Sequence, residues 1–569
     1  MWPLRRRATQ PEREWGAAID RDRSRVRARE RATEDARIWK DLALDAVFAR
    51  IDRCVTALGQ ERLLDRLRLG TRAALPTDEL ARFDAEVRSF TAPARRAAFR
   101  RSLEPLSRSR GAADLGALLK EGPPPTPRWA AFFPLATGLT IASALAILLW
   151  PKALLALVGC VLVNIAIRLR LHASMTMHAD ALAALGSVVA TARALHLELP
   201  RMPGERALGW TTMDVTAQNE VLAAILTYVN VFLLVDVNAF VRSLALVREM
   251  RPVLLRIHTR IGDLDAAYAI SSFRAGLARW AAPDFTGRGT AIRAIGVAHP
   301  LVADAVTNDA VLDPADGWLV LGSNASGKST FAKALGLQAV LAQSIATTTC
   351  ASYAAPSLRV WTIIAVEDSL ETKRSHFVVE AEAARDMLLG DAGVDTDRLC
   401  IVDELFRGTN TADRVAAGAA FLRALRRDGA TVVAATHDAE LLTLLDEYRP
   451  HYFTETVTDG DLVFDYRLRE GAAAPRNALA VLALAGFPAH VLADARSFAE
   501  RLPTAVLPSN PIPDRNHCSA EPTPANEEAF ERYRVDGAAR FRRPDHARDL
   551  PPEEGVDALA PDRVSGRRA

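Results

Sequence analysis

The segment Leu319–Phe331 reads LVLGSNASGKSTF: a short apolar run, then a glycine-bracketed loop, then an alanine- and leucine-rich helical stretch. This order of strand, GxxxxGK[ST] loop and helix is typical of a phosphate-binding loop. Glycines let backbone N–H groups turn inward around phosphate oxygens, and the following helix presents its positive N-terminal end to the same anion. A chance match in a Gly/Ser-rich loop is disfavoured because strand and helix flank it correctly. The segment predicts a nucleotide-binding site.

Every residue of this loop is a candidate contact for the nucleotide. Lys328 is expected to reach the β/γ-phosphates, and the hydroxyl of Ser329 is expected to ligate Mg²⁺. The candidate binding residues are Gly322, Ser323, Asn324, Ala325, Ser326, Gly327, Lys328, Ser329 and Thr330. A nucleotide bound with Mg²⁺ is therefore expected.

The composition of the 569-residue chain is that of an ordinary globular protein, with 25% charged and 49% hydrophobic residues. A net charge of +2 decides nothing about partners, so any nucleic-acid argument must rest on local charge. The cysteines are scattered and form no CxxC pair, which favours reduced packing residues over a disulfide framework or a zinc site. They are Cys54, Cys160, Cys350, Cys400 and Cys518. No apolar core follows the basic N-terminus, so we expect no cleavable signal peptide.

The N-terminal third predicts helices. Residues 1–40 form an arm of mixed charge that favours a solvated helix over a nucleic-acid or headgroup contact. In residues 41–121, apolar residues from Leu44 to Leu67 recur at helical spacing, interrupted at Gly59. Thr77 and the acidic residues after it predict the start of another helix. The interpretation is a helical core that ends at GPPPTP, Gly122–Pro127.

Residues 129–168 contain two apolar runs, Trp129–Leu149 and Ala153–Ile167, separated by Pro151 and Lys152. The first is long enough to cross a hydrocarbon core of about 30 Å, and no charged residue interrupts either run. Basic residues at the outer ends, Arg128 before the runs and Arg168 and Arg170 after them, predict an inner-membrane hairpin with both termini and the nucleotide-binding region in the cytoplasm. A buried helical hairpin inside a large core remains the alternative.

Residues 169–285 again show helical spacing and are interpreted as the second part of the helical core. Val221–Val241 is apolar enough to span a membrane, but it contains Asn230, Asp236 and Asn238, which are costly in lipid. We therefore interpret it as a buried core helix. Arg242–Arg260 carries a candidate basic face for which simple solvation is favoured.

Residues 286–505 change to alternating short β-rich runs and helical segments, which predicts an α/β fold with a parallel sheet covered by helices on both faces. The expected strands are Trp318–Leu321, Val360–Val366, Leu399–Val402 and Thr431–Ala434. Residues 506–569 are rich in proline, arginine and acidic residues without periodicity, which is typical of a disordered tail.

Two of these strands end in chemically useful residues. Leu399–Glu404 is a buried strand that ends in two carboxylates, of which Asp403 fits a Mg²⁺ partner and Glu404 a group that orients or deprotonates the attacking water. The strand that begins at Thr431 ends in His437, which is placed to hydrogen-bond the γ-phosphate or the water. Glu404 and His437 are the candidate catalytic residues, and Asp403 and Ser329 the candidate metal ligands.

These motifs together resemble the ATPase domain of the MutS family, the DNA mismatch-repair ATPases, over residues Ile295–Leu502. HPLV, a G-x-N-x-x-GKSTF loop, DELFRGTNTADR and ATHDAEL follow in the family's order, as do Ser375–Glu380, FDYRLREG and AGFPAHV. The departures are Ser323 for the usual proline, Phe406 for glycine and Asn410 for serine. Phe48–Leu67 and Val231–Arg274 resemble, more weakly, the family's helical core and lever helices.

The resemblance implies a homodimer in which Ser375 of each chain completes the partner's ATP site. It also implies a DNA-binding, mismatch-repair-related ATPase switch. Only Met1–Lys40 precede the core, so we expect the mismatch-reading domain with its Phe-x-Glu wedge to be absent. The alternative is a membrane-associated nucleotide switch that acts on a protein or lipid partner without DNA. An ABC transporter ATPase is disfavoured because LSGGQ is absent.

Overall fold

The computed structural model describes residues 34–72, 77–109, 111–199, 228–323, 325–364, 376–390, 396–458, 461–472, 479, 482–483 and 486–501. The predicted tail, 506–569, and most of the N-terminal arm therefore lie outside the described residues.

The N-terminal helices build the helical core, together with the long helix α13, Val235–Ala275. They are α2 (Glu34–Asp41), α3 (Leu44–Ile51), α4 (Ala57–Arg72), α5 (Thr77–Ser89), α6 (Pro93–Ser107) and α7 (Ala112–Glu121). The apolar spacing from Leu44 to Leu67 is confirmed as the buried face of α3 and α4. The segment Glu34–Asp41 differs from the predicted solvated arm, because Ile38 is buried and Asp41 accepts hydrogen bonds from Thr362 Oγ1 (2.9 Å) and the N–H of Ile364 (3.1 Å).

The predicted interruption at Gly59 is wrong, because the helix breaks earlier and Gly59 lies inside α4. The hydroxyl of Thr56 accepts a hydrogen bond from the N–H of Gly59, as an N-cap residue does. Asp265 of α13 accepts hydrogen bonds from the N–H groups of Val55 and Thr56 and from the Thr56 hydroxyl. A Cβ at Gly59 would lie 2.3 Å from Oδ2 of Asp265, so this position requires glycine. The glycine serves close packing against α13.

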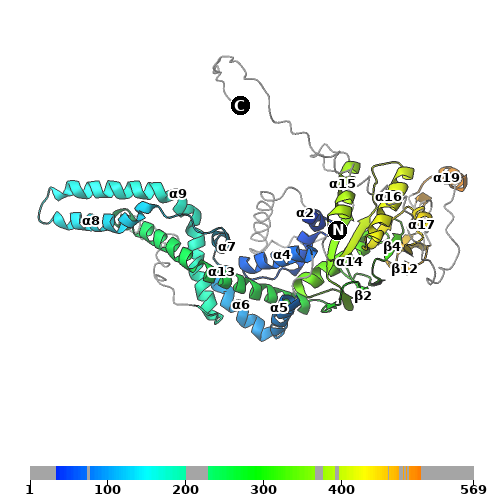
Figure 1. Cartoon of the computed structure of the whole chain (residues 1–569), viewed down its shortest axis with the longest axis horizontal. Helices are drawn as coiled ribbons and strands as arrows, with labels where there is room; N and C mark the ends of the chain where they lie inside the picture. Colours follow the sequence, from blue (N-terminus) through cyan, green and yellow to red (C-terminus); the bar gives the residue numbers. More distant parts are fainter. Residues whose placement is uncertain are drawn as a thin grey trace, which may run out of the picture. The chain divides into compact units, whose positions relative to one another are not determined.

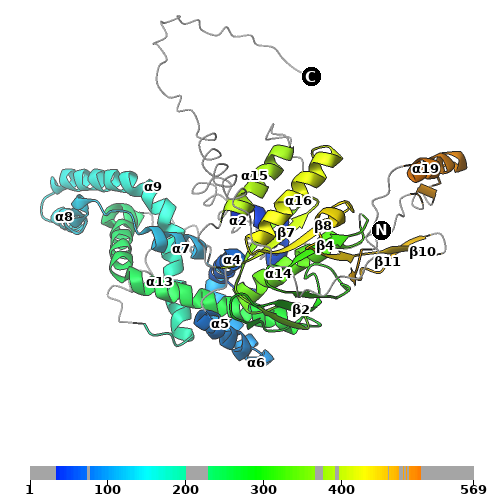
Figure 2. The same ribbon diagram turned by 45° about the vertical axis from the view of Figure 1, so that its right-hand side comes forward.

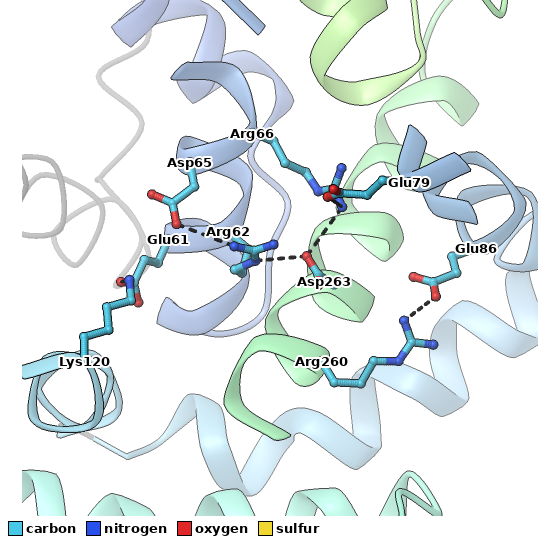
Figure 3. A network of polar contacts seen from close by, with 9 residues as sticks. All are labelled: Glu61, Arg62, Asp65, Arg66, Glu79, Glu86, Lys120, Arg260 and Asp263. Atoms are coloured by element: carbon cyan, nitrogen blue, oxygen red, sulfur yellow. Dashed lines mark hydrogen bonds and ion pairs between the residues drawn. The ribbon is translucent and has the colours of Figure 1, made fainter. Parts of the chain in front are cut away.

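A network of charged side chains joins α4, α5, α7 and α13 (Figure 3). Arg66 of α4 lies over the ring of Phe83 at 3.9 Å and reaches Glu79 of α5 and Asp263 of α13. In the same network Arg62 pairs with Asp263, Arg260 with Glu86 and Lys120 with Glu61. Part of the candidate basic face on α13 is thus used internally, since Arg251 also donates to the carbonyl groups of Leu119 and Lys120 at the end of α7.

The apolar runs of residues 129–168 form a helical hairpin, in which α8 lies beside the first half of α9 (Figure 1). The segments are the 3-10 helix η1 (Arg128–Phe132), α8 (Phe133–Ala146) and α9 (Ala153–Ala194). Arg128–Ala146 and Ala153–Ala194 are both long and apolar enough to cross a membrane, by length and composition alone. Only 11% of each apolar window is buried, so these side chains are not the interior of a core within the described residues.

The segment Val221–Val241 is not one buried helix within its described part. Helical residues 228–233 end at Leu234, whose φ of 49° breaks the helix before α13 begins at Val235. Tyr228 is 68% exposed. The other end of α13 meets α14 (Lys328–Ile345): Arg274 donates to the carbonyl of Ala346 and to Thr347 Oγ1.

The predicted parallel sheet is confirmed. Its strand order is β12–β9–β4–β8–β7–β6, with all neighbouring pairs parallel except β12–β9. The strands are β12 (Arg469–Glu470), β9 (Arg449–Tyr452), β4 (Gly317–Leu321), β8 (Thr431–Thr436), β7 (Asp397–Asp403) and β6 (Leu358–Ile364). The predicted residues 365 and 366 of β6 lie outside the described part.

Helices cover both faces of this sheet, with α15 (His376–Leu389) and α16 (Thr411–Arg427) on one face and α14 on the other (Figure 2). Alternate strand residues enter two different apolar clusters: Leu319 and Leu321 pack with α15 and α16, whereas Val320 packs with α14. This alternation confirms that the strands are buried on both sides.

Smaller elements complete the α/β region. A second sheet, which the sequence did not predict, has the order β1–β5–β2–β3, and β10 pairs with β11. Their bounds are β1 Asp284–Phe285, β2 Ile292–Val297, β3 Asn308–Leu312, β5 Ser352–Ala355, β10 Glu455–Thr458 and β11 Asp461–Phe464. The short helix α17 spans Leu441–Leu444, and α19 spans Ala489–Arg501.

Candidate functional site

The loop from Gly322 to Gly327 connects β4 to α14 and depends on backbone conformations that favour glycine. Gly322 has a φ of 148° and Gly327 a φ of 110°. A Cβ at Gly322 would lie 2.7 Å from Ser326 Oγ and 3.0 Å from the carbonyl oxygen of Phe453. Ala325 also has a positive φ, 68°. The glycine positions of the motif are thus required by the turn itself, which folds at the N-terminal end of α14 where the helix favours an anion.

Lys328 is the first residue of α14, and its side chain is folded into the loop. Its Nζ donates hydrogen bonds to the carbonyl oxygens of Gly322 (2.7 Å) and Ser323 (2.8 Å). Burial lowers the pKa of Lys328, an effect opposed by the nearby carboxylate of Asp403. A buried ammonium surrounded by oxygen acceptors fits a phosphate-binding role.

The hydroxyl groups of the loop differ in exposure. Ser326 is buried, and its Oγ has no hydrogen-bond partner among the described residues. Ser329 is half-buried and Thr330 is exposed. Asn324 lies outside the described residues. An orphaned buried hydroxyl costs free energy unless a ligand or water satisfies it, so Ser326 fits a phosphate contact.

The carboxyl ends of three strands meet beside the loop, as the sequence predicts. Strand β8 lies between β4 and β7, and its register pairs Thr436 with Leu321 and Ala435 with Asp403. Because parallel strands end at the same edge, the loop after β4, the two carboxylates after β7 and His437 after β8 are neighbours.

Asp403 is the last residue of β7 and is only 4% exposed, yet its Oδ1 has no hydrogen-bond partner among the described residues. A buried carboxylate oxygen without a donor is costly unless a cation or its water is nearby. The oxygen ligand and its position fit Mg²⁺, which commonly takes one or two carboxylates and completes its shell with phosphates and water. The described residues contain no cluster of three or more His, Cys, Asp or Glu that could hold a metal alone.

Glu404 follows in the left-handed region, with a φ of 51°, and its N–H donates to the carbonyl of Ala435 (2.9 Å). Its carboxylate is almost fully buried among basic side chains: Oε1 lies 3.9 Å from Lys328 Nζ, and Oε2 contacts Arg407 and lies 3.5 Å from His437 Nδ1. The strained turn aims this carboxylate at the loop while Asp403 stays in the strand.

The second candidate catalytic residue, His437, is 48% exposed, and its Nε2 lies 3.7 Å from Oδ1 of Asp438. Asp438 is held by two hydrogen bonds from Arg414, at 2.9 and 2.7 Å, and this pair raises the pKa of Arg414. Arg407, Arg414 and Asp438 lie within the motifs DELFRGTNTADR and ATHDAEL, but no role was predicted for them. The only feature of the sequence that could have indicated these residues is their charge close to the predicted ends of the strands.

The departures from the usual motif have physical explanations. Phe406 has a φ of 61°, the conformation that favours glycine, and its ring packs against Phe377 (5.8 Å) and Phe421 (6.3 Å). Asn410 is the N-cap of α16, accepting a hydrogen bond from the N–H of Asp413 at 3.0 Å, a role that asparagine and serine fill equally well. Ser323 accepts a hydrogen bond from Lys328 Nζ through its backbone carbonyl, which proline also carries, so this departure leaves the contact intact.

An aromatic side chain that sequence reasoning missed lies next to the loop. Tyr466 is 45% exposed, and a Cβ at Gly327 would lie 3.2 Å from its ring carbon Cδ1. Its carbonyl accepts a hydrogen bond from Asn308, which also accepts one from the N–H of Leu468. The ring of Phe464 stacks on it at 5.9 Å. An exposed ring face beside a phosphate loop can stack on a nucleobase.

Ser375, the candidate contact to a partner's nucleotide, lies outside the described residues, and α15 begins at the next residue, His376. Phe377 in the first turn of this helix contacts Gly408, where a Cβ would lie 3.0 Å from Phe377 Cβ. The start of α15 is therefore packed against the segment that follows Glu404.

Comparison with known proteins matches this region to one family. The family model described as "MutS domain V" matches residues 318–503. A relative named DNA mismatch repair protein MutS from Lactobacillus gasseri is 30% identical over 282 residues, which are 47% of this chain and 32% of the relative. Proteins of the same name from Erythrobacter litoralis and Roseiflexus sp. are each 32% identical, over 46% and 45% of this chain and 31% and 24% of the relative. The chain spans between about a quarter and a third of the length of these curated relatives.

Proposed function

Because this chain belongs to the MutS family through its ATPase domain, we propose that it binds and hydrolyses Mg·ATP and uses the nucleotide to switch conformation. The observation that carries the proposal is the convergence on one loop of Lys328, Asp403 and Glu404 from β4–α14 and β7. The steady-state rate of ATP hydrolysis in Glu404→Gln, set against the wild type, tests this proposal.

Each residue then has a separate task. Lys328 and the N–H groups of the loop hold the phosphates, and the hydroxyl of Ser326 donates a hydrogen bond to them. Asp403 and Ser329 would hold Mg²⁺, which neutralises charge that develops on the phosphates. Glu404 orients and deprotonates the attacking water, and the exposed His437 positions that water or the γ-phosphate. Tyr466 stacks on the adenine ring.

The second subunit enters through Ser375. By family resemblance, two ATPase domains face each other in a homodimer, and Ser375, the residue before α15 in the sequence, contacts the γ-phosphate bound by the partner subunit. Sedimentation with Mg·ATP and with no nucleotide tests this arrangement. ATP should favour the dimer, and the substitution Ser375→Ala should remove that preference while each monomer still binds nucleotide.

We further propose that the hairpin of α8 and α9 tethers the ATPase to the cytoplasmic membrane, with both termini in the cytoplasm. The exposed apolar windows of both helices support this tether, as do Arg128 and Arg170 at one end of the hairpin. Flotation of the intact protein with phospholipid vesicles tests it. A version without residues 129–167 should stay in the soluble fraction. Flotation of that version would show that the hairpin is not what attaches the protein to the membrane.

DNA is the macromolecular partner proposed on the family relation. Binding to DNA must weaken steeply between 50 and 200 mM salt if phosphate contacts supply the affinity, with about a tenfold loss for every two or so such contacts. Absence of binding at low salt would favour the second candidate, a switch whose partner is a membrane protein or lipid. The exposed hairpin is the observation that favours this second candidate.

A further inference from the structure

The break at Leu234 is stabilised by side chains from both helices of the hairpin. Nδ2 of Asn164 on α9 donates to the carbonyl of Phe232 at 2.9 Å and to Thr140 Oγ1 at 3.1 Å. Oγ1 of Thr137 on α8 donates to the carbonyl of Leu233 at 2.8 Å. Asn164 is fully buried. The hairpin therefore supplies hydrogen-bond donors to carbonyl groups that have lost their helical N–H partners at the break.

The polar residues that argued against a membrane location have partners here. Asp236 pairs with Arg168 of α9 at 2.8 Å and also accepts from the N–H of Val237. Nδ2 of Asn238 donates to the carbonyl of Leu234 at 2.9 Å. In lipid the cost of such groups comes from leaving them without hydrogen bonds, and irregular backbone is tolerated at membrane depth when protein groups satisfy it. The composition of this segment thus no longer excludes it from the membrane.

Three exposed arginines mark one level along the hairpin. Trp129, Leu171 and Val241 belong to a single small apolar cluster at the end of the hairpin distant from its turn. Their sequence neighbours Arg128, Arg170 and Arg242 are all exposed and come from three different segments. Exposed arginines at this end of three segments fit the headgroup level of an anionic cytoplasmic leaflet.

Residues 228–234 lie on the apolar side of that level. Asn164 precedes Arg168 by about one helical turn toward the hairpin's turn, and it contacts Phe232. Exposed apolar surface continues from α8 and α9 onto this segment, where Tyr228 is 68% and Phe232 39% exposed. Acyl chains suit this continuous apolar surface, whereas water does not.

We propose that residues 228–234 are a third membrane-embedded segment, which packs on the hairpin through Asn164 and Thr137 and turns Tyr228 and Phe232 toward lipid acyl chains. This inference rests on the proposed membrane tether. The lipid bilayer then contacts one apolar surface, which is formed by the hairpin and by residues 228–234 before α13. The tether is then anchored to the helical core by three segments.

The test uses the full-length protein, with its five cysteines replaced by alanine, reconstituted in phosphatidylcholine–phosphatidylglycerol vesicles. Single cysteines at Phe232→Cys or Arg242→Cys are reacted with a membrane-impermeant maleimide added on the ATPase side. Arg242→Cys should label as fast as it does after solubilisation and denaturation. Phe232→Cys should label about tenfold more slowly, because acyl chains exclude the reagent.

A second set of variants tests the packing. Asn164→Leu should raise the labelling rate of Phe232→Cys toward that of Arg242→Cys, and Thr137→Val should act in the same direction if Asn164→Leu does not fold. Ser143→Leu is the matched control, since Ser143 lies on α8 and faces position 160 of α9, which is alanine in this background, instead of residues 228–234. It should leave the rate unchanged.

The outcomes separate the two proposals. Failure of the wild-type protein to float with vesicles overturns the tether and this inference with it. Flotation with equally fast labelling of Phe232→Cys and Arg242→Cys overturns the third segment and leaves the tether standing. Continued protection of Phe232→Cys in both the Asn164→Leu and Thr137→Val variants overturns the assigned packing.

Discussion

Nζ of Lys328 lies 3.9 Å from Oε1 of Glu404, which joins the phosphate loop to the carboxylate after β7. The same carboxylate contacts Arg407 and lies 3.5 Å from His437 Nδ1, so three basic side chains surround one nearly buried acid. A nucleotide that enters the loop brings negative charge to this cluster and competes with Glu404 for Lys328. Under the proposed function, ATP would therefore free Glu404 to act on water.

Lys328→Ala should weaken ATP binding by about tenfold or more, because a buried charged hydrogen bond to phosphate contributes roughly 1.5–3 kcal/mol. Titration of a fluorescent ATP analogue in the presence of Mg²⁺ measures the change. Lys333→Ala, also on α14 but outside the loop, is the matched control and should bind as the wild type does. Unchanged affinity in Lys328→Ala would contradict the phosphate-loop assignment.

Tyr466→Ala should lower ATP affinity by about tenfold, since stacking of a base on an aromatic ring contributes roughly 1–3 kcal/mol. Tyr466→Phe keeps the ring and should bind ATP normally. Inorganic triphosphate lacks the base, so its affinity should be the same in all three proteins. An equal loss for ATP and triphosphate in Tyr466→Ala would indicate damage to the loop instead of lost stacking.

Phe406 combines a glycine-like backbone with a packed aromatic ring. Both Phe406→Ala and Phe406→Gly lose the ring packing and should destabilise the domain by about 3–5 kcal/mol. Glycine adopts a φ of 61° without the strain that alanine carries, so Phe406→Gly should be about 1 kcal/mol more stable than Phe406→Ala. Chemical denaturation of the two variants measures the order, and the reverse order would show that the backbone at this position is not left-handed.

Burial raises the pKa of Asp265 to about 7, although its hydrogen bonds to Val55 and Thr56 act in the opposite direction. The unfolded carboxyl group titrates near 3.9, so the folded state binds more protons between about pH 4 and pH 7. Stability from this group is present below about pH 4 and is lost as pH rises through about 7, by roughly 4 kcal/mol in total.

Asp265→Asn removes that titration. Denaturation curves at several pH values should show that the stability advantage of the wild type over Asp265→Asn shrinks as pH rises from 4 to 7. If the stability difference between the two proteins does not change with pH, the carboxyl group of Asp265 is more solvated than the structure shows. Asp263→Asn, on the surface-facing charge network of the same helix, provides the comparison.

The candidate nucleotide site was largely predictable because local pattern and chemistry agree there. A glycine-bracketed loop has few alternatives, and parallel strands place their carboxyl ends together whatever lies between them, so Asp403, Glu404 and His437 could be assigned to one edge. The roles of Arg407, Arg414 and Asp438 could not be predicted, because salt-bridge partners depend on side-chain positions that no sequence period encodes.

The sequence predicted which faces of the core helices are buried, but it did not predict where those helices are interrupted. The apolar spacing continues across the end of α3, so it did not show where that helix stops. Gly59 suggested an interruption that does not exist. Glycine is required there because Asp265 of α13 packs directly against it. The break at Leu234 has no glycine or proline to signal it. Its stability comes from Asn164 and Thr137, which lie far away in the sequence.

The most direct measurement of the central claim is steady-state ATP hydrolysis by the full-length protein and by Glu404→Gln, with ATP affinity measured in parallel. We predict Mg²⁺-dependent hydrolysis by the wild type, and a loss of about 100-fold or more in Glu404→Gln, since a general base contributes about that much. ATP binding should be retained in the variant, and Glu440→Gln, an exposed glutamate near the same strand edge, should hydrolyse ATP normally. Wild-type turnover in Glu404→Gln, or no hydrolysis by the wild type with Mg²⁺, would contradict the assignment of this site as a MutS-type ATPase.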